Sequence, residues 1–349
     1  MRIVVNDIAA STGGALTVLT EFYNCVKQND RENEWIFLLG DHLLEETDNI
    51  KIRVLKDVKR SGFKKLIFDF FTGKKYICNL QPDIVVSLQN IITFGLKIPQ
   101  ILYIHQSIPF QKTKKFSFFK ARERKLAVYQ YLIAAIIKRS AKKSHKVIVQ
   151  TEWIRQAICK TCKVPLQKVI KITPNVKEIP IPNRIKDFQN NRFFYPTSDD
   201  IYKNNKLIYD ASSILEKQKK EHTIIMTLPI GRSQGMVQCI GRVPYEQVLE
   251  QYEISTLLFP SYIESFGYPL AEARKIGTVV LASDTPFARE VLAGYENAYF
   301  FDPFKAEELA MLMSRVIAGE IERRPIFLKQ EERNDSWLMM LKQIYQVGV

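Results

Sequence analysis

Short apolar runs recur along the whole chain, and the stretches between them are long enough to form helices. Such runs are typical of strands in a parallel sheet, whose two faces are both covered by the helices of the crossover connections. The sequence therefore predicts an α/β protein. The predicted strands comprise residues 2–6, 35–39, 52–55, 84–87, 100–105, 147–150, 168–172, 193–195, 223–228, 236–240, 256–259 and 278–282.

A polar, proline-containing stretch over residues 177–191 interrupts this alternation and divides the predicted strands into two series. A chain of 349 residues is long for one domain and comfortable for two. We therefore expect an N-terminal domain over residues 1–176 and a C-terminal domain over residues 177–334. Two such domains joined by a linker suit a ligand that binds in the cleft between them.

The composition narrows the class of protein further. Hydrophobic residues make up 46% of the chain, which is enough for sizeable cores and argues against a disordered protein. No apolar run approaches the roughly 20 residues that span a bilayer, and the N-terminus reads as a strand rather than a signal peptide. Five cysteines leave an odd thiol, and no second pair joins Cys159 and Cys162 to complete a zinc site. We expect reduced thiols in a cytoplasmic protein.

The segment over residues 260–277 reads as a strand end, a glycine turn and a short helix. Pro269 suits the first helical turn, where its missing N–H would have no partner, and Gly277 suits the position just past the helix end. A helix N-terminus presents free amides and the positive end of the helix dipole, which together bind phosphate. The amides expected there belong to Phe266, Gly267 and Tyr268.

Two carboxylates, Glu264 and Glu272, flank this expected phosphate seat. A carboxylate beside a bound diphosphate is poorly placed to contact phosphate, but it accepts hydrogen bonds from hydroxyl groups. The pattern indicates a nucleotide sugar, with phosphates on the amides, ribose on one carboxylate and hexose near the other. The alternative is an ordinary strand–turn–helix whose glutamates face water.

The segment resembles the signature of the retaining glycosyltransferases with the GT-B fold, the glycosyl transferases group 1 (glycosyltransferase family 4). That signature has two glutamates separated by seven residues, and here it reads Glu264-Ser-Phe-Gly-Tyr-Pro-Leu-Ala-Glu272. The resemblance implies two Rossmann-like parallel-sheet domains that face each other across a cleft. It also implies a C-terminal helix, at about residues 335–349, that packs back on the N-terminal domain.

The resemblance also implies roles in donor binding. Glu272 would bind the ribose hydroxyls and Glu264, as a catalytic residue, the hexose hydroxyls. The phosphates would be held by Lys203 together with Ser265, Phe266, Gly267 and Tyr268. Relatives commonly carry an arginine five residues before this lysine, but Ser198 stands there, and Arg232 is a candidate for the second charge.

Three N-terminal positions also match the resembled family. Gly13 and Gly14 correspond to a loop that borders donor and acceptor, although a Gly-Gly pair is often only a turn. His105 ends an apolar strand and corresponds to a catalytic histidine that contacts the donor sugar near the reacting carbon. Capping of local structure is the other explanation for His105. Asn90, at an equivalent rim of the sheet, is a candidate on the acceptor side.

Positive charge is concentrated in residues 112–146, which contain twelve lysines and arginines and one acidic residue, in a chain of net charge +14. Aromatic residues lie among these cations. The combination suits an anionic membrane surface, which attracts basic residues and accommodates apolar side chains. A nucleic acid would use the same features, but no nucleic-acid motif is present and we expect no such partner. A solvated helical face is the plainest alternative.

Together these features predict a retaining, metal-independent glycosyltransferase without a cofactor, whose donor is a UDP- or GDP-sugar. The resemblance implies a glycan or lipid-linked glycan acceptor in bacterial surface polysaccharide biosynthesis, at the inner face of the plasma membrane. Two alternatives stay open. One is an epimerase or phosphorylase on the same fold, and the other is a basic, non-enzymatic protein that binds nucleic acid or membrane.

Overall fold

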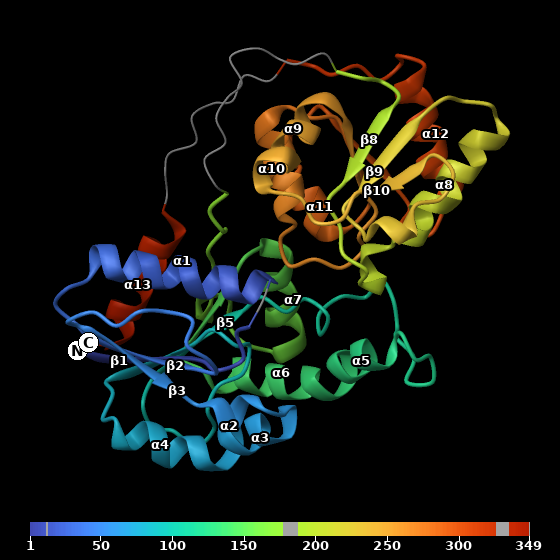
Figure 1. Cartoon of the computed structure of the whole chain (residues 1–349). Coiled ribbons are helices and arrows are strands. Elements are labelled where there is room, and N and C mark those ends of the chain that lie inside the picture. Colours follow the sequence, from blue (N-terminus) through green and yellow to red (C-terminus); the bar gives the residue numbers. More distant parts are fainter. Residues whose placement is uncertain (12, 177–187, 326–334, 349) are drawn as a thin grey trace. The chain divides into compact units, whose positions relative to one another are not determined.

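The computed structural model describes residues 1–11, 13–176, 188–325 and 335–348, and the chain divides into two compact units (Figure 1). Unit 1 comprises residues 1–175 and 333–349, and unit 2 comprises residues 176–332. Of the linker expected over residues 177–191, residues 177–187 lie outside the described part of the chain.

Unit 1 contains a seven-stranded sheet in the order β3-β2-β1-β4-β5-β6-β7, and every neighbouring pair is parallel. Its strands are β1 (Arg2–Asp7), β2 (Glu34–Leu39), β3 (Ile50–Val54), β4 (Ile84–Ser87), β5 (Gln100–Ile104), β6 (Lys146–Val149) and β7 (Val169–Lys171). Almost all residues of the central strands are buried, as the continuous apolar runs require.

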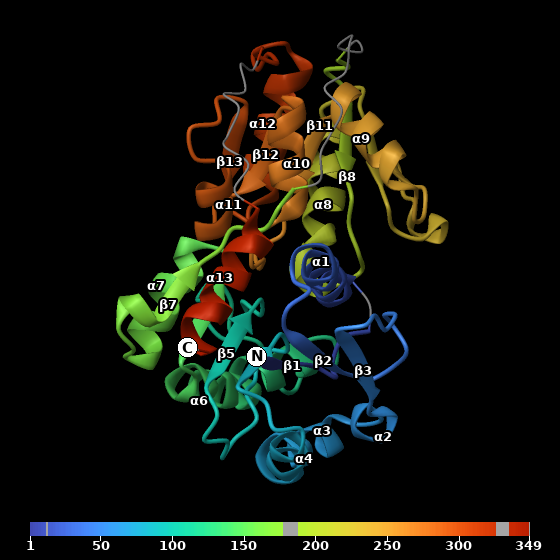
Figure 2. The ribbon, with the colours of Figure 1, turned by 90° about the vertical axis from the view of Figure 1, so that its left-hand side faces the viewer.

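Helices cover both faces of this sheet. The helical segments are α1 (Gly13–Asn29), α2 (Lys56–Lys59), α3 (Gly62–Ile67), η1 (Phe68–Thr72), α4 (Gly73–Asn79), α5 (Arg124–Ala127), η2 (Val128–Ile133), α6 (Ala134–Lys143), α7 (Glu152–Cys162), η3 (Leu166–Lys168) and α13 (Ser336–Gly348). Figure 2 shows α1 and α13 on the face opposite α4.

The C-terminal helix α13 contributes to the core of unit 1. The ring of Trp337 lies 5.7 Å from that of Phe22 in α1 and 5.9 Å from that of Tyr103 in β5, measured between ring centroids. The Trp337 indole also donates a hydrogen bond to Glu21. Residues from the two ends of the chain therefore share one hydrophobic cluster.

Unit 2 contains a six-stranded parallel sheet in the order β10-β9-β8-β11-β12-β13. Its strands are β8 (Arg192–Tyr195), β9 (Thr223–Met226), β10 (Val237–Cys239), β11 (Thr256–Phe259), β12 (Val280–Ser283) and β13 (Ala298–Phe301). Its helical segments are η4 (Ile201–Lys203), α8 (Asn205–Lys217), η5 (Ile230–Arg232), α9 (Tyr245–Ile254), α10 (Tyr268–Ile276), α11 (Pro286–Val291) and α12 (Ala306–Ile317). Within this unit, α8 and α12 lie on one face of the sheet, and α9, α10 and α11 lie on the other (Figure 1).

The prediction of two Rossmann-like parallel sheets covered by helices is confirmed, although several strand bounds differ by a few residues. The strand β13 is not among the predicted strands, because it is an edge strand of which three residues are only partly buried and it lacks the buried pattern of the central strands. The prediction that His105 ends a strand is wrong, since β5 ends at Ile104 and His105 begins the following loop.

In each sheet the strand order reverses at one place, between β1 and β4 in unit 1 and between β8 and β11 in unit 2. Ligands of open α/β sheets bind at such switch points, beyond the carboxyl ends of the strands. The topology therefore predicts a ligand site at the loops that follow these four strands. Across the described ranges, no helix is both long and apolar enough to cross a bilayer.

Candidate functional site

The turn before α10 has the conformation that the sequence predicts. Gly267 precedes the helix with a φ of 92°, which glycine adopts without strain, and a Cβ there would lie 3.3 Å from Leu270 Cδ1. Pro269 stands in the first helical turn, and Gly277 ends the helix with a φ of 85°. The guanidinium of Arg323 donates to the carbonyls of Ile276 and Gly277.

The N-terminus of α10 follows the loop after β11, and its C-terminus carries the Arg323 contacts. A cation at the carboxyl end of a helix complements the helix dipole, whose positive end lies at the other terminus. Phe266 is buried and packs its ring edge-on against Tyr268, with 5.3 Å between centroids. The two aromatic side chains that flank Gly267 therefore contact each other across the turn.

Lys203 and Glu264 form the central polar contact of unit 2. Lys203 Nζ donates to Glu264 Oε1 at 2.6 Å, and Ser261 Oγ donates to the same oxygen at 2.8 Å. The two side chains are 19% and 17% exposed, so the ion pair is shielded on most sides yet open to a ligand. The pair places one cation and one carboxylate at the same point of the sheet edge.

The two loops that carry this pair are joined by a backbone hydrogen bond, in which the Tyr262 amide donates to the carbonyl of Tyr202 at 3.1 Å. The side-chain hydroxyl of Tyr195, at the end of β8, donates to the carbonyl of Lys203 at 3.0 Å and holds the first loop to its own strand. Asn204, in a left-handed conformation with a φ of 58°, donates to the carbonyl of Pro260. Lys203 follows β8 and Glu264 follows β11, so the pair stands at the switch point of this sheet.

Glu272 lies in α10 and is only 9% exposed. The Tyr245 hydroxyl donates to its Oε1 at 3.1 Å, and the Tyr252 hydroxyl donates to its Oε2 at 3.2 Å. Burial, together with the nearby Glu272 carboxylate, raises the pKa of both tyrosines, which keeps them protonated as donors. An ionised carboxylate has about four acceptor positions, so ligand hydroxyls can share it with the tyrosines.

The sequence reading did not identify the two tyrosines as site residues. They stand seven residues apart in α9, which places them two turns apart on one helical face. The seven-residue spacing is the sequence feature that places both tyrosines on one face of α9. It indicates a contact with Glu272 only once α9 is known to pack against α10.

Ser198, in the position expected for a phosphate-binding arginine, donates to Asp200 at 2.8 Å. Arg232 pairs with the neighbouring Asp199, with 2.7 Å between Nη2 and Oδ2. Both side chains of that pair are about half exposed. The guanidinium therefore lies beside the loop that lacks the arginine.

In unit 1 the predicted residues lie at the start of α1 and in the loops after β4 and β5. Gly13 and Gly14 begin α1 rather than preceding it, and a Cβ at either position would meet no atom within 4 Å. Asn90 and His105 are in direct contact, with 3.2 Å between Asn90 Nδ2 and His105 Nε2. The structure thus brings together Asn90 with His105 in one unit, and Lys203 with Glu264 in the other.

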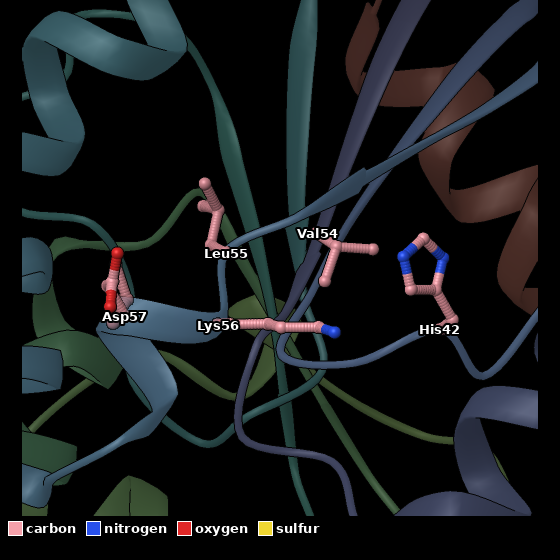
Figure 3. A pocket seen from close by; sticks show the side chains of 6 residues that line it. His42, Val54, Leu55, Lys56 and Asp57 are labelled. Atoms are coloured by element: carbon pink, nitrogen blue, oxygen red, sulfur yellow. The ribbon is translucent and has the colours of Figure 1, made fainter.

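One surface pocket in unit 1 lies apart from all these residues. It is lined by His42 and residues 54–58, at the end of β3 and the start of α2 (Figure 3). None of the residues that the sequence singled out lines it. Within the described ranges, no group of three or more histidine, cysteine, aspartate or glutamate side chains is arranged to hold a metal ion.

The basic segment over residues 112–146 forms a loop followed by α5, η2 and α6. Its one acid, Glu123, accepts from the Ser117 amide at 2.9 Å and pairs with Lys114 at 3.3 Å. These contacts lower the pKa of Glu123, and its charge is compensated within the segment. Phe119 is 95% exposed, and further exposed apolar side chains of the segment are Phe118, Tyr131 and Leu132.

The fold is shared with solved glycosyltransferase structures. Over 99% of both chains it matches the lipopolysaccharide outer core galactosyltransferase WaaB in its apo form, with a TM-score of 0.64 and 17% identity. Sucrose-phosphate synthase from Thermosynechococcus elongatus matches over 99% of this chain and 98% of its own, with a TM-score of 0.69 and 14% identity. HepE of Anabaena with UDP-glucose matches over 100% and 97%, with a TM-score of 0.61 and 15% identity.

These likenesses show that the chain has the two-domain GT-B fold. Residues 232–332 match the family model described as Glycosyl transferases group 1, a range that includes Glu264 and Glu272. The resemblance that the sequence indicated is confirmed over this part of the chain. No curated protein sequence matches the chain.

Proposed function

We propose that the protein is a retaining glycosyltransferase that moves a hexose from a nucleotide-diphosphate donor to an acceptor hydroxyl. The observation that carries the proposal is the Lys203–Glu264 pair at the switch point of unit 2, beside the N-terminus of α10. A cation and helix amides suit a diphosphate, while the carboxylates suit hydroxyl groups. Glu272 binds the ribose in this proposal, and Glu264 binds the hexose.

The proposed reaction depends mainly on charge stabilisation and positioning. The bond between the anomeric carbon and the phosphate oxygen breaks, and the acceptor oxygen bonds to the same face of that carbon. The hydroxyl proton leaves with the nucleotide diphosphate. Lys203 and the amides at the start of α10 stabilise the charge that grows on the departing phosphate, with His105 at the sugar and Arg232 as a second cation.

A UDP-sugar is the donor that we favour. HepE, whose fold this chain shares, was solved with UDP-glucose, which supports a uridine nucleotide over a guanosine nucleotide. We propose that transfer requires no divalent metal, because Lys203 and the helix N-terminus supply positive charge at the phosphates.

We further propose a lipid-linked glycan acceptor at the inner face of an anionic membrane, which unit 1 contacts through residues 112–146. A phenylalanine that is 95% exposed loses its contact with water when it enters the headgroup region, which favours binding. The surrounding lysines and arginines are attracted to anionic lipid. WaaB, named as a lipopolysaccharide outer core galactosyltransferase, shares the fold and supports a bacterial surface polysaccharide as the product.

Product analysis tests the reaction. The protein is incubated with UDP-glucose, UDP-galactose and GDP-mannose, each with and without alkyl glycosides as acceptors, and each with a chelator present. We expect acceptor-dependent release of nucleotide diphosphate and a new glycoside with the anomeric configuration of the donor. Conversion of the sugar nucleotide without acceptor would favour an epimerase. Salt-sensitive binding to nucleic acid without any turnover would favour a basic binding protein.

A further inference from the structure

Among the described residues, the side chain of Asn90 makes three polar contacts, all with the start of the loop after β5. Asn90 Oδ1 accepts from the amides of His105 and Gln106 at 2.8 Å and 2.9 Å. On its other side, Asn90 Nδ2 lies 3.2 Å from His105 Nε2. One amide group therefore holds both the backbone and the ring of His105.

These contacts determine which atom of the amide faces the ring. Two backbone N–H groups require an acceptor, so the oxygen of Asn90 must point toward them and the NH2 group toward the ring. An NH2 group only donates, so His105 Nε2 must be the unprotonated, accepting nitrogen. A neutral imidazole with an unprotonated Nε2 carries its hydrogen on Nδ1.

His105 Nδ1 is buried, and it has no hydrogen-bond partner among the described residues. Burial also lowers the pKa of His105 to about 4, so the ring is neutral at physiological pH. A buried N–H without an acceptor is costly, and native structures seldom retain one without a reason. An acceptor oxygen supplied by a ligand would satisfy it.

We propose that Asn90 is a positioning residue, which holds neutral His105 as the Nδ1–H tautomer and presents that N–H to an oxygen atom of the sugar substrate. The role assigned to the ligand rests on the proposed function, whereas the tautomer rests on the hydrogen bonds of unit 1 alone. Asn90 thereby acts through His105 rather than on the acceptor.

The backbone of Asn90 explains why asparagine suits the position. Its φ is 66°, in the left-handed region that asparagine enters more readily than most residues with a side chain. Aspartate tolerates the same region, and glycine enters it freely. Asn90→Asp and Asn90→Gly are therefore matched variants that change the side chain with little cost in backbone strain.

The Asn90→Asp variant reverses the polarity at the ring. One carboxylate oxygen still accepts from the two backbone amides, but the other meets His105 Nε2 as an acceptor and demands a hydrogen there. The nearby negative charge also favours the protonated ring. In Asn90→Gly the NH2 group that donates to Nε2 is lost, so this contact no longer selects a tautomer.

The test is ¹⁵N NMR of the histidine rings in the full chain. The chain has four histidines, and the His105→Gln variant identifies the signals of His105. We expect a single neutral Nδ1–H tautomer in the wild type, a shift to Nε2–H or to the doubly protonated ring in Asn90→Asp, and a mixture in Asn90→Gly. An Nε2–H tautomer in the wild type, or identical tautomers in all three proteins, would overturn the proposal.

Ligand titration tests the second half of the proposal. On addition of UDP-glucose, UDP-galactose or GDP-mannose, we expect the wild-type Nδ1 signal to move, and kcat/KM to fall about tenfold to hundredfold in Asn90→Asp. An unmoved Nδ1 signal under a sugar nucleotide that measurably stabilises the protein would overturn it, as would unchanged turnover in Asn90→Asp. Absence of any sugar-nucleotide binding would instead refute the proposed function and with it the ligand role, while the tautomer result would stand.

Discussion

Lys203 Nζ and Glu264 Oε1 lie 2.6 Å apart, at the point where the strand order of the unit 2 sheet reverses. The two residues stand 61 positions apart in the chain and are brought together because β8 and β11 are neighbours. An ammonium group has three donors, so Lys203 can keep its bond to Glu264 and still donate to a phosphate. The pair is therefore preorganised for a ligand that carries both phosphate and hydroxyl groups.

The Lys203→Gln variant tests the role of this cation in the proposed transfer. We expect kcat to fall about a hundredfold, because a donor aimed at developing negative charge stabilises the transition state more than the ground state. Steady-state kinetics with the best donor measures the effect. Lys206→Gln is the matched control, since Lys206 is largely exposed and its ion pair among the described residues is with Asp210. Similar rates for both variants would contradict the role of Lys203.

The Tyr245→Phe variant tests how Glu272 is held. The ring is retained, but Oε1 of Glu272 loses the hydroxyl that donates to it at 3.1 Å. We expect the donor Kd to rise about threefold to tenfold, which corresponds to the loss of one ordinary hydrogen bond. Isothermal titration with the donor and with the free nucleotide measures it. Unchanged affinity for both ligands would show that Tyr252 alone suffices.

Local features of the candidate site could be predicted from the sequence, whereas pairings between distant residues could not. The turn and helix over residues 260–277 follow from local chemistry, because Pro269 and Gly277 act within their own segment. The pairing of Lys203 with Glu264, and of Asn90 with His105, depends on which strands are neighbours. Composition and periodicity carry little information about such long-range pairings.

The degree of burial of a strand explains whether the sequence predicts it. The central strands are continuous apolar runs because helices cover both faces, whereas β13 lies at the sheet edge with partly exposed residues. For a related reason, the sequence does not predict Tyr245 and Tyr252 as site residues. Tyrosines on one helical face are ordinary core residues unless a carboxylate from another helix lies opposite them.

The lowered pKa of His105 predicts a pH effect on stability. In the unfolded chain the ring takes up a proton near pH 6.5, whereas in the folded protein it does so near pH 4. Between these values the unfolded state binds more protons, so acidification lowers the free energy of unfolding. We expect the wild type to lose stability relative to His105→Gln as the pH falls through this window, as measured by urea unfolding. A difference that stays constant with pH would contradict neutral burial of the ring.

Vesicle binding tests the basic, aromatic surface of residues 112–146. We expect the protein to sediment with vesicles that contain phosphatidylglycerol but not with pure phosphatidylcholine, and binding to weaken with salt. The Phe119→Ala variant should bind several-fold more weakly, because apolar burial is lost. Phe63→Ala is the control, since Phe63 is also exposed, at 74%, but lies in α3. Equal binding by both variants would argue against insertion of Phe119.

The central claim is that unit 2 binds a nucleotide sugar through Glu272 and the pair of Lys203 and Glu264. Thermal stabilisation by a panel of UDP- and GDP-sugars and free nucleotides tests it most directly, because a ligand that binds only the folded state raises Tm. We predict that one nucleotide family raises the Tm of the wild type and that Glu272→Ala abolishes the shift. No shift with any nucleotide sugar, or an equal shift in Glu272→Ala, would contradict the claim.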